Sequence, residues 1–578
     1  MGTVTDSEQV TFHARPLGPR GSRGVVGSAD PAAELTPTAA AVLCAIPAWW
    51  VARATKVGLS GKWLDVHQAL NVEPPLVLAG APPLERDWGP MTGEQVGSAY
   101  VEALSDSTRA RHGRHYTPAA LAAELWVLTK RALGLKSEVN ALPGLLRDPA
   151  CGAAALLLPA LREHLVASWD TDPRLVLNGL PRLIEGVDTD PAAAWVANVV
   201  MAAEMLPTFA RVPERHRRPL PCLARVGDGL ATDLAPARAV LMNPPYGRVK
   251  LSEADRARFA DTLYGHANLY GIFMAAAEQT LDQEGVLSAL VPTSFTAGRY
   301  FAPLRAMLSS RMRLQSIGFV EDRSGVFGGV LQETCLAAFT RKRARRTTVT
   351  SLGSSVSTVA TVDTPRGDGP WLLPRRTDLA PVAAAAATMP LTLADCGWRV
   401  STGPLVWNRR KADLFARPGN NRHPIIWAAD IDGGTLHRDS ARNNTRYVRL
   451  ADKEHGAYLL TEPAILAQRT TAPEQPRRIV AAELTADDLD SWGDVVVENH
   501  VNVIRPANLV PLISPGLLYR LLSTDAIDRL LRCISGSVAL SAYELESLRL
   551  PDADTLASWE TLSQEALERK VAVTYRAT

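Results

Sequence analysis

A short run, Asn243-Pro244-Pro245-Tyr246, carries the most specific chemistry in this 578-residue chain. The two prolines fix the backbone φ angle and lack an N–H, so the run offers hydrogen-bond acceptors on a rigid backbone. Those acceptors are the side-chain carbonyl of Asn243 and the main-chain carbonyl of Pro244, and Tyr246 adds an aromatic face. The run therefore suits a planar ligand that stacks on a ring and donates an amino group to two acceptors.

Three acidic residues precede this run, each at the end of a short apolar stretch. Asp148 lies in RDPACGAAALL, Asp188 in LIEGVDTDP and Asp228 in VGDGL. In open α/β sheets, ligands bind outside the carboxyl ends of the strands. The Asp188 carboxylate suits ribose hydroxyls, and Asp228 suits the amino group of an adenine ring. Asp190, which precedes a proline-started helix, is expected to be a helix cap.

The elements that would position these residues alternate between short apolar strands and Ala-rich helices. This βαβα alternation predicts a mostly parallel sheet with helices on both faces. The expected strands are Gly144–Arg147, Leu183–Val187, Ala224–Val226, Ala239–Met242, Gly285–Val291, Leu314–Phe319 and Thr334–Phe339.

Composition divides the chain into five regions. Residues 1–35 are rich in Gly, Pro, Arg and Ser and are expected to be disordered, and 36–135 read as an N-terminal helical region. Residues 136–350 form the α/β domain that carries the motifs. The segment 351–390 is expected to be a linker, and 391–578 a second domain with mixed elements.

Bulk properties are those of a globular protein, with 46% apolar and 21% charged residues. The net charge of +2 does not indicate a nucleic-acid partner, although basic residues cluster at 215–218 and 341–346. Each cluster is as consistent with a solvated loop as with a polyanion site. The six cysteines lie far apart without a CxxC pair, so we expect neither a zinc site nor disulfides. Free cysteines favour a cytoplasmic location. We expect no signal peptide and no membrane span, because the longest apolar stretch, 39–52, is too short.

The four strand-end motifs, in this order, resemble those of N6-adenine DNA methyltransferases of the gamma arrangement. The resemblance covers most of 90–340 and, more loosely, 395–551. It implies a Rossmann-like, seven-stranded domain that binds S-adenosylmethionine, followed by an α+β target-recognition domain. The C-terminal phrases resemble type II modification enzymes of the XhoI/SalI kind. The implied partners are double-stranded DNA and, functionally, a cognate restriction endonuclease, with the chain acting as a monomer.

The resemblance also assigns roles to individual residues. Asn243, Pro244, Pro245 and Tyr246 would hold an extruded adenine, and Phe327 would pack against it. No metal is required. Residues expected to contact the cofactor are Tyr116, Thr117, Pro118, Asp148, Ala150, Cys151, Gly152, Asp188, Asp228, Leu230 and Asn268. Residues expected to contact DNA are Arg409, Arg469, Arg477, Arg478, Asn499 and Asn502.

One departure from the family pattern lies in the cofactor loop. The family commonly has DPACGSG, whereas this chain has Ala153 and Ala154 at the last two positions. If the second glycine serves a positive φ angle, Ala154 carries a conformational cost.

Parts of the sequence are also compatible with three other functions. A protein glutamine methyltransferase shares this motif set, since an amide nitrogen poses the same chemical problem, but such enzymes are usually shorter and lack an Arg-rich C-terminal domain. A DNA-binding specificity protein with a degenerate site would follow if Ala154 had abolished cofactor binding. A fused restriction–modification enzyme would need two acids and a lysine for cleavage, which are not evident in the first 90 residues.

Overall fold

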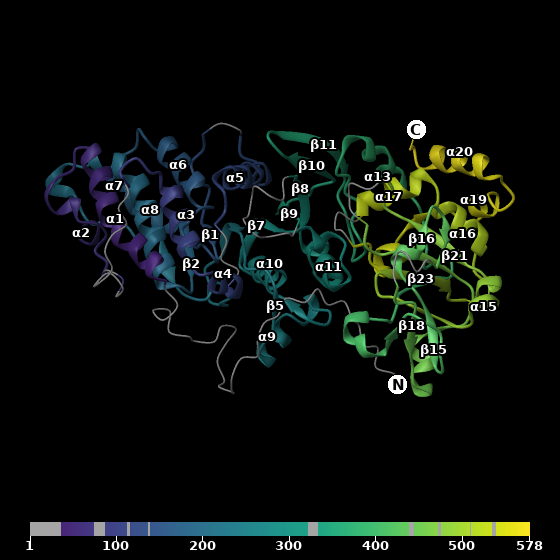
Figure 1. Cartoon of the computed structure of the whole chain (residues 1–578). Coiled ribbons are helices and arrows are strands. Elements are labelled where there is room, and N and C mark those ends of the chain that lie inside the picture. Colours follow the sequence, from purple (N-terminus) through teal and green to yellow (C-terminus); the bar gives the residue numbers. More distant parts are fainter. Residues whose placement is uncertain are drawn as a thin grey trace.

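The computed structural model describes residues 36–73, 75, 87–112, 116–136, 139–321, 333–438, 444–471, 476–508, 510–534 and 539–577. The segment 1–35, expected to be disordered, lies outside the described residues. The molecule is elongated, with the N-terminal helices at one end, a large sheet in the middle and the C-terminal part at the other end (Figure 1).

A nine-stranded sheet forms the centre of the described structure, in the order β11-β10-β8-β9-β7-β4-β1-β2-β3. The strands β3, β2, β1, β4 and β7 run parallel, and β9 lies antiparallel between β7 and β8. Their bounds are β1 Leu146–Asp148, β2 Ile184–Asp188, β3 Ala224–Val226, β4 Ala237–Met242, β7 Leu281–Pro292, β8 Arg313–Val320, β9 Thr334–Thr340, β10 Arg346–Leu352 and β11 Val356–Asp363.

All seven expected strands are present, with small shifts at their ends, but the sheet is larger than the seven strands expected. Strand β10 adds parallel to β8, and β11 pairs antiparallel with β10. The expected linker 351–390 is therefore ordered in part, since β11 lies in the sheet and α13 (Ala380–Ala386) packs on a C-terminal helix. β-branched Val and Thr residues at positions 356, 358, 359, 361 and 362 favour a strand at β11, which the Ser- and Thr-rich composition concealed.

Helices cover both faces of the sheet, as the alternation of elements predicted. Ala239 and Leu241 of β4 face a core shared with the N-terminal helices, whereas Val240 and Met242 face a second core. This division follows from the two-residue repeat of a strand. The first core contains α1 (Pro37–Lys56), α3 (Gly93–Ala103), α5 (Ala119–Leu133) and α8 (Pro191–Ala210), and the second contains α10 (Leu269–Gln279) and α11 (Ala302–Arg311).

Two of these helices, α1 and α8, are long and apolar enough to cross a membrane by length and composition alone. Almost every residue of α8 is buried, and α1 packs against both α3 and α8. Both helices therefore contribute to the core, as expected for the apolar stretch 39–52.

The C-terminal part combines short strands with helices. A four-stranded sheet contains β13 (Trp398–Thr402), β23 (Val501–Pro506), β20 (Ala464–Gln468) and β21 (Ala481–Leu484), and its strands pair antiparallel. A five-stranded sheet contains β14 (Leu414–Phe415), β18 (Tyr447–Arg449), β15 (Arg422–Ile426), β22 (Val495–Val497) and β19 (Leu459–Leu460). The accompanying helices include α16 (Pro515–Leu522), α17 (Asp525–Ile534), α18 (Ala542–Glu546) and α20 (Gln564–Thr574).

Candidate active site

The predicted motifs meet at one edge of the central sheet. Strands β1 and β4 are parallel neighbours, with Leu146 opposite Ala239 and Arg147 opposite Val240. Asp148 ends β1, and Asn243 directly follows β4, so both lie at the carboxyl edge that binds ligands in open α/β sheets. The ends of β2 and β3, with Asp188 and Asp228, extend the same edge.

Backbone N–H groups fix the acids of the first two strand ends. The Ala150 N–H donates to Asp148 Oδ1 at 3.1 Å. Asp188 accepts from the Gly152 N–H at 2.9 Å and from the Asp190 N–H at 2.9 Å. Asp188 therefore ties the loop after β1 to the end of β2. Asp190 caps α8 by accepting from the Ala192 N–H, as predicted, and also accepts from the Tyr100 hydroxyl at 2.9 Å.

The loop after β3 packs directly on the loop after β1. A Cβ added to Gly229 would lie 1.8 Å from the Pro149 carbonyl oxygen, so only glycine permits this approach. The Leu230 N–H donates to Asp228 Oδ1 at 2.9 Å, and the Asp228 side chain is exposed. The loop after β1 thus contacts both of the other acid-bearing loops.

The carboxyl group of Asp148 is fully enclosed. Burial, together with the nearby Asp188 carboxylate, raises the pKa of Asp148 to about 8 against the lowering effect of the Ala150 N–H. Desolvation disfavours the charged form of an acid unless a cation compensates. A buried acid at this edge is accordingly suited to a positively charged ligand.

Helix α3, which precedes the α/β domain in the sequence, packs against the loop after β1. A Cβ on Gly97 would lie 2.9 Å from both the Ala153 Cβ and the Tyr116 ring. The Tyr116 hydroxyl is buried with no hydrogen-bond partner among the described residues, and so is Oδ1 of Asn268. Buried polar atoms are rarely left unsatisfied in proteins. The unsatisfied Tyr116 hydroxyl lies near the loop after β1 and is compatible with a polar cofactor there.

The cofactor loop adopts the strained backbone that its sequence suggested. Ala154 has φ +66° and is completely buried, and Gly152 has φ +49°. A left-handed conformation is unfavourable for alanine, whereas glycine adopts it readily. The Cys151 Sγ packs towards β2, since a Cβ on Gly186 would lie 2.8 Å from it. The side chain of Cys151 is therefore a packing group, and burial raises its pKa well above the ordinary value.

The Asn243 amide is held between two hydroxyl groups. Its Nδ2 donates to Thr117 Oγ1 at 3.0 Å, and its Oδ1 accepts from the Tyr246 hydroxyl at 3.0 Å. The Tyr246 hydroxyl also lies 3.1 Å from the Leu290 carbonyl. The half-buried Tyr246 ring meets Tyr270 edge to face, at a centroid distance of 6.0 Å.

A short ladder attaches the segment after Tyr246 to the start of α10. Strand β5 (Arg248–Val249) pairs antiparallel with β6 (Ala267–Asn268), and the Leu269 N–H donates to the Gly247 carbonyl at 2.8 Å. Asn268 is thereby brought beside the segment that follows the acceptor run. Phe327, predicted to pack against the base, lies outside the described residues.

Three of the predicted DNA contacts gather near one end of the four-stranded sheet. The Asn499 N–H donates to the Leu405 carbonyl at 3.0 Å, which brings this turn beside the turn that carries the exposed Arg409. Arg469 Nη1 donates to the Asn499 carbonyl at 3.4 Å. These three residues lie far apart in the sequence, and the fold brings them close together.

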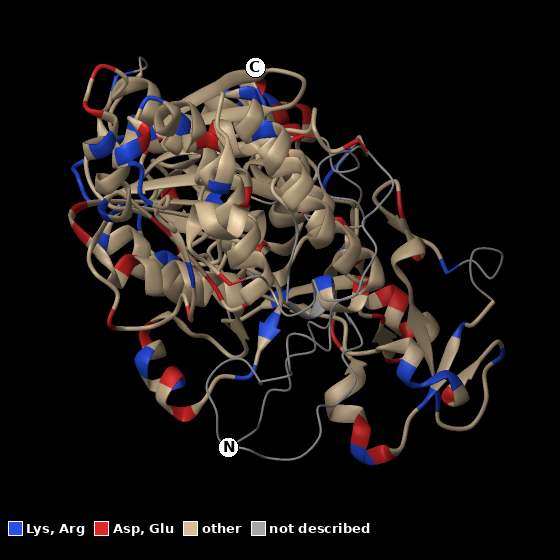
Figure 2. Ribbon diagram, turned by 90° about the vertical axis from the view of Figure 1, so that its left-hand side faces the viewer, with Lys and Arg blue, Asp and Glu red and all other residues tan. Residues whose placement is uncertain are grey.

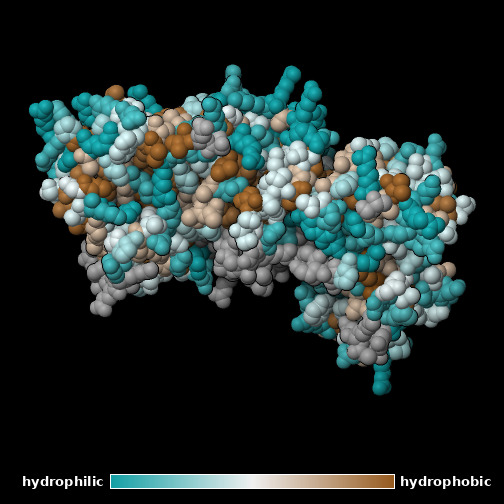
Figure 3. Space-filling model, turned by 90° about the horizontal axis from the view of Figure 1, so that it is seen from above, coloured by the Kyte–Doolittle hydropathy of each residue, from teal (hydrophilic) through white to brown (hydrophobic). Residues whose placement is uncertain are grey.

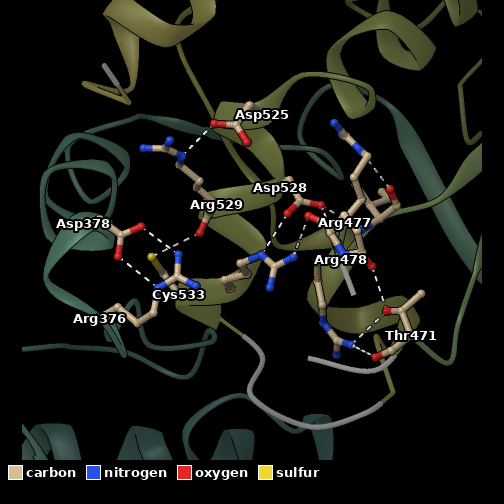
Figure 4. A network of polar contacts seen from close by, with 12 residues as sticks. Arg376, Asp378, Thr471, Arg477, Arg478, Asp525, Asp528, Arg529 and Cys533 are labelled. Atoms are coloured by element: carbon tan, nitrogen blue, oxygen red, sulfur yellow. Dashed lines mark hydrogen bonds and ion pairs between the residues drawn. The ribbon is translucent and has the colours of Figure 1, made fainter. Parts of the chain in front are cut away.

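Of the other three predicted DNA contacts, Arg478 and Asn502 are wrong because both side chains are buried, whereas Arg477 is half-buried and its role stays a prediction. Arg478 is 1% exposed and donates to Thr471 through both the main-chain and side-chain oxygens (Figure 4). Asn502 is fully buried and donates to the Leu540 carbonyl at 2.8 Å. Arg477 donates to the carbonyls of Leu522 and Thr524, both at 3.2 Å.

Charged residues of both signs are interspersed along the ribbon (Figure 2). In the basic cluster 341–346, Arg341 pairs with Glu278, Lys342 with Glu284 and Arg346 with Asp363. Because these basic residues pair with acids of the same chain, the cluster gives no specific support for a polyanion site. Viewed from above, hydrophilic residues cover most of the visible surface, with smaller hydrophobic patches (Figure 3).

Sequence reasoning missed several residues that shape the site. Gly97, Tyr100 and Gly229 support the cofactor loops from outside through the contacts described above. Glycine and tyrosine on a helix have no distinctive spacing, so only tertiary packing reveals them. Among the described residues, no group of three or more His, Cys, Asp or Glu side chains could hold a metal ion.

Comparison with known proteins agrees with this geometry. Residues 238–327 match the Eco57I restriction-modification methylase family. The chain is 28% identical to the type II methyltransferase M.PstI of Providencia stuartii over 55% of this chain and 65% of that protein. It is 25% identical to the type II methyltransferase M.XhoI of Xanthomonas vasicola, over 58% of this chain and 68% of that protein.

Among solved structures, the type IIL restriction-modification enzyme MmeI, determined in complex with DNA, has a similar fold. The TM-score is 0.50 at 14% sequence identity, and the match covers 92% of this chain and 86% of MmeI. Residues 238–327, which contain the acceptor run, are therefore similar to restriction-modification methylases of the Eco57I type. Over more than half of its length, the chain is similar to type II methyltransferases.

Proposed function

We propose that this protein is a site-specific DNA methyltransferase that transfers a methyl group from S-adenosylmethionine to the N6 amino group of adenine. One observation carries the proposal: the Asn243–Pro244 acceptors follow the strand next to the one that ends at Asp148. The acceptors for an amino group and the loop for a cationic cofactor therefore share one edge of the sheet.

The acceptors would activate a poor nucleophile. The N6 lone pair of adenine is delocalised into the ring. Hydrogen bonds from the amino group to Asn243 Oδ1 and the Pro244 carbonyl would favour a more tetrahedral nitrogen with a localised lone pair. Asn243 Oδ1 already accepts from Tyr246, but a carbonyl oxygen has two lone pairs, so it can accept again.

The cofactor loops would hold the methyl donor in line with that nitrogen. S-adenosylmethionine, when bound, supplies an electrophilic methyl group on a sulfonium centre. Asp148 and Asp188 would bind its charged and hydroxyl groups, Asp228 its adenine, and Tyr116 and Asn268 its remaining polar atoms. The contribution of this chain would be positioning and electrostatics, with no strong general base needed because the proton can leave after transfer.

The target base would have to leave the duplex to reach this edge. Extrusion costs a few kcal/mol, and stacking of a base on an aromatic ring recovers about 1–3 kcal/mol. Tyr246 would supply one such ring, and Phe327 remains the proposed second. The contacts of the Tyr246 hydroxyl with Asn243 and Leu290 would hold the Tyr246 ring in a fixed orientation.

The C-terminal part would select the DNA sequence. Arg409, Arg469 and Asn499 remain the proposed contacts, because arginine suits guanine edges and asparagine suits adenine edges. We further propose that the protein acts in the cytoplasm as a monomer and protects host DNA from a cognate restriction endonuclease.

Mass spectrometry of the product nucleosides tests the proposal. Unmethylated plasmid DNA is incubated with the protein and S-adenosylmethionine, digested, and analysed for methylated bases. The proposal predicts N6-methyladenine that depends on both protein and cofactor. Methylated cytosine alone, methyl transfer to protein glutamine but not DNA, or absence of any product would refute it.

A further inference from the structure

The contacts of Asn243 point to a role for Thr117 that differs from the cofactor contact implied by resemblance. Thr117 is buried and lies directly before α5, whereas Asn243 follows β4, 126 positions further along the chain. The Thr117 hydroxyl accepts from Asn243 Nδ2 at 3.0 Å. This hydrogen bond joins the segment before the cofactor domain to the acceptor run.

The orientation of the Asn243 amide decides whether the acceptor pair can work. A primary amide that turns over presents NH₂ where the carbonyl oxygen stood. The Asn243 NH₂ and the target amino group, both donors, would then face each other, and the lone pair would not be localised. The contact with Thr117 restricts rotation of the amide, and in the observed orientation Thr117 accepts at the nitrogen end while the oxygen end faces Tyr246.

We propose that Thr117 is a positioning residue that fixes the Asn243 amide for methyl transfer. The inference rests on the proposed function. The Tyr246 hydroxyl holds the amide less firmly than Thr117 does, because its single hydrogen is shared between Asn243 Oδ1 and the Leu290 carbonyl. Thr117 also sits beside Tyr116 and so connects amide orientation to the loop that binds the cofactor.

A positioning role for Thr117 predicts that its loss lowers kcat and leaves cofactor affinity unchanged. The variant Thr117→Val tests this prediction. Valine keeps the branched shape and removes the hydroxyl. Loss of a buried hydrogen bond in the transition state lowers a rate by about 10- to 100-fold. We expect kcat for N6-methyladenine formation to fall by that factor, with the Kd for S-adenosylmethionine, measured by calorimetry, within about threefold of wild type.

Two further variants complete the experiment. Thr117→Ser keeps the hydroxyl and is expected to restore kcat to within about threefold of wild type. Thr129→Val is the matched control, because Thr129 is also buried and hydrogen-bonded, to Leu125 and Ser288, but lies away from Asn243. It is expected to retain the wild-type kcat. If Thr117→Val does not fold, as judged by thermal melting, Thr117→Ala removes the same hydroxyl with a smaller side chain.

Each alternative outcome identifies what failed. A wild-type kcat in Thr117→Val, or a loss that Thr117→Ser does not restore, would overturn the positioning role while the proposed function stands. A loss seen entirely as weaker cofactor binding would make Thr117 a cofactor contact instead. Absence of N6-methyladenine with the wild-type protein would reject the proposed function itself, and the inference with it.

Discussion

At the residue scale, the site depends on a buried acid, Asp148. Burial raises the pKa of Asp148 to about 8, from an ordinary value near 4. The folded chain therefore holds this proton more tightly than the unfolded chain does. The resulting stabilisation is complete below about pH 4 and is lost as the pH rises through about 8.

The Asp148→Asn variant isolates this effect. Asparagine keeps the shape and the acceptor for the Ala150 N–H but cannot ionise. Between pH 6 and 9, without cofactor, we expect the melting temperature of wild type to fall relative to that of the variant. Scanning calorimetry over this range measures the difference, and parallel curves for the two proteins would contradict the enclosed carboxyl group.

Ala154 has a strained backbone, with φ +66° in a buried loop. Ala154→Gly should relieve a left-handed alanine and stabilise the protein by about 1 kcal/mol, raising the melting temperature by about 2–4 °C. Ala153→Gly is the matched control, because this neighbour is buried without a positive φ and should lose stability. Equal effects of the two substitutions in thermal melts would argue against strain at Ala154.

At the scale of elements, helix α3 supports the cofactor loop through the absence of a side chain at Gly97. Gly97→Ala would place a Cβ 2.9 Å from Ala153 and from Tyr116, so the loop or the helix must move. We expect about tenfold weaker binding of S-adenosylmethionine by calorimetry, with the fold retained. Ser98→Ala, at the next position of the helix, should bind normally. Unchanged affinity in Gly97→Ala would show that α3 does not shape the loop.

The strand-end motifs were predictable because each joins a local pattern to a known edge of the sheet. Asp148, Asp188, Asp228 and Asn243 all lie where the alternation of elements placed them. The partners of the C-terminal arginines were not predictable, because an arginine side chain binds phosphates, bases and buried carbonyls equally well. Arg478 illustrates this, because its Thr471 contacts depend on a tertiary arrangement that no local pattern encodes.

At the scale of the whole molecule, Arg305 connects the catalytic sheet to the C-terminal part. It is fully buried and donates to the Phe295 and Gly298 carbonyls and to the Asp368 and Gly369 carbonyls. Its Nη2 also lies 3.4 Å from the Tyr543 hydroxyl in α18. One guanidinium thus joins three segments far apart in the sequence.

Replacing Arg305 should loosen that connection. Arg305→Met leaves several buried carbonyls without donors and should cost about 3 kcal/mol. Calorimetry should then resolve separate transitions for the two parts. Arg311→Gln is the control on the same helix, since its half-exposed pair with Glu278 is worth about 1 kcal/mol or less. A single transition at the wild-type temperature in Arg305→Met would contradict the connecting role.

The most direct measurement compares cofactor binding and methyl transfer in Asn243→Ala. We predict a Kd for S-adenosylmethionine within about threefold of wild type and no detectable N6-methyladenine in a single-turnover reaction, because the acceptor acts on the target nitrogen in the transition state. Methylation by this variant at the wild-type rate would contradict the shared site at the carboxyl ends of β1 and β4.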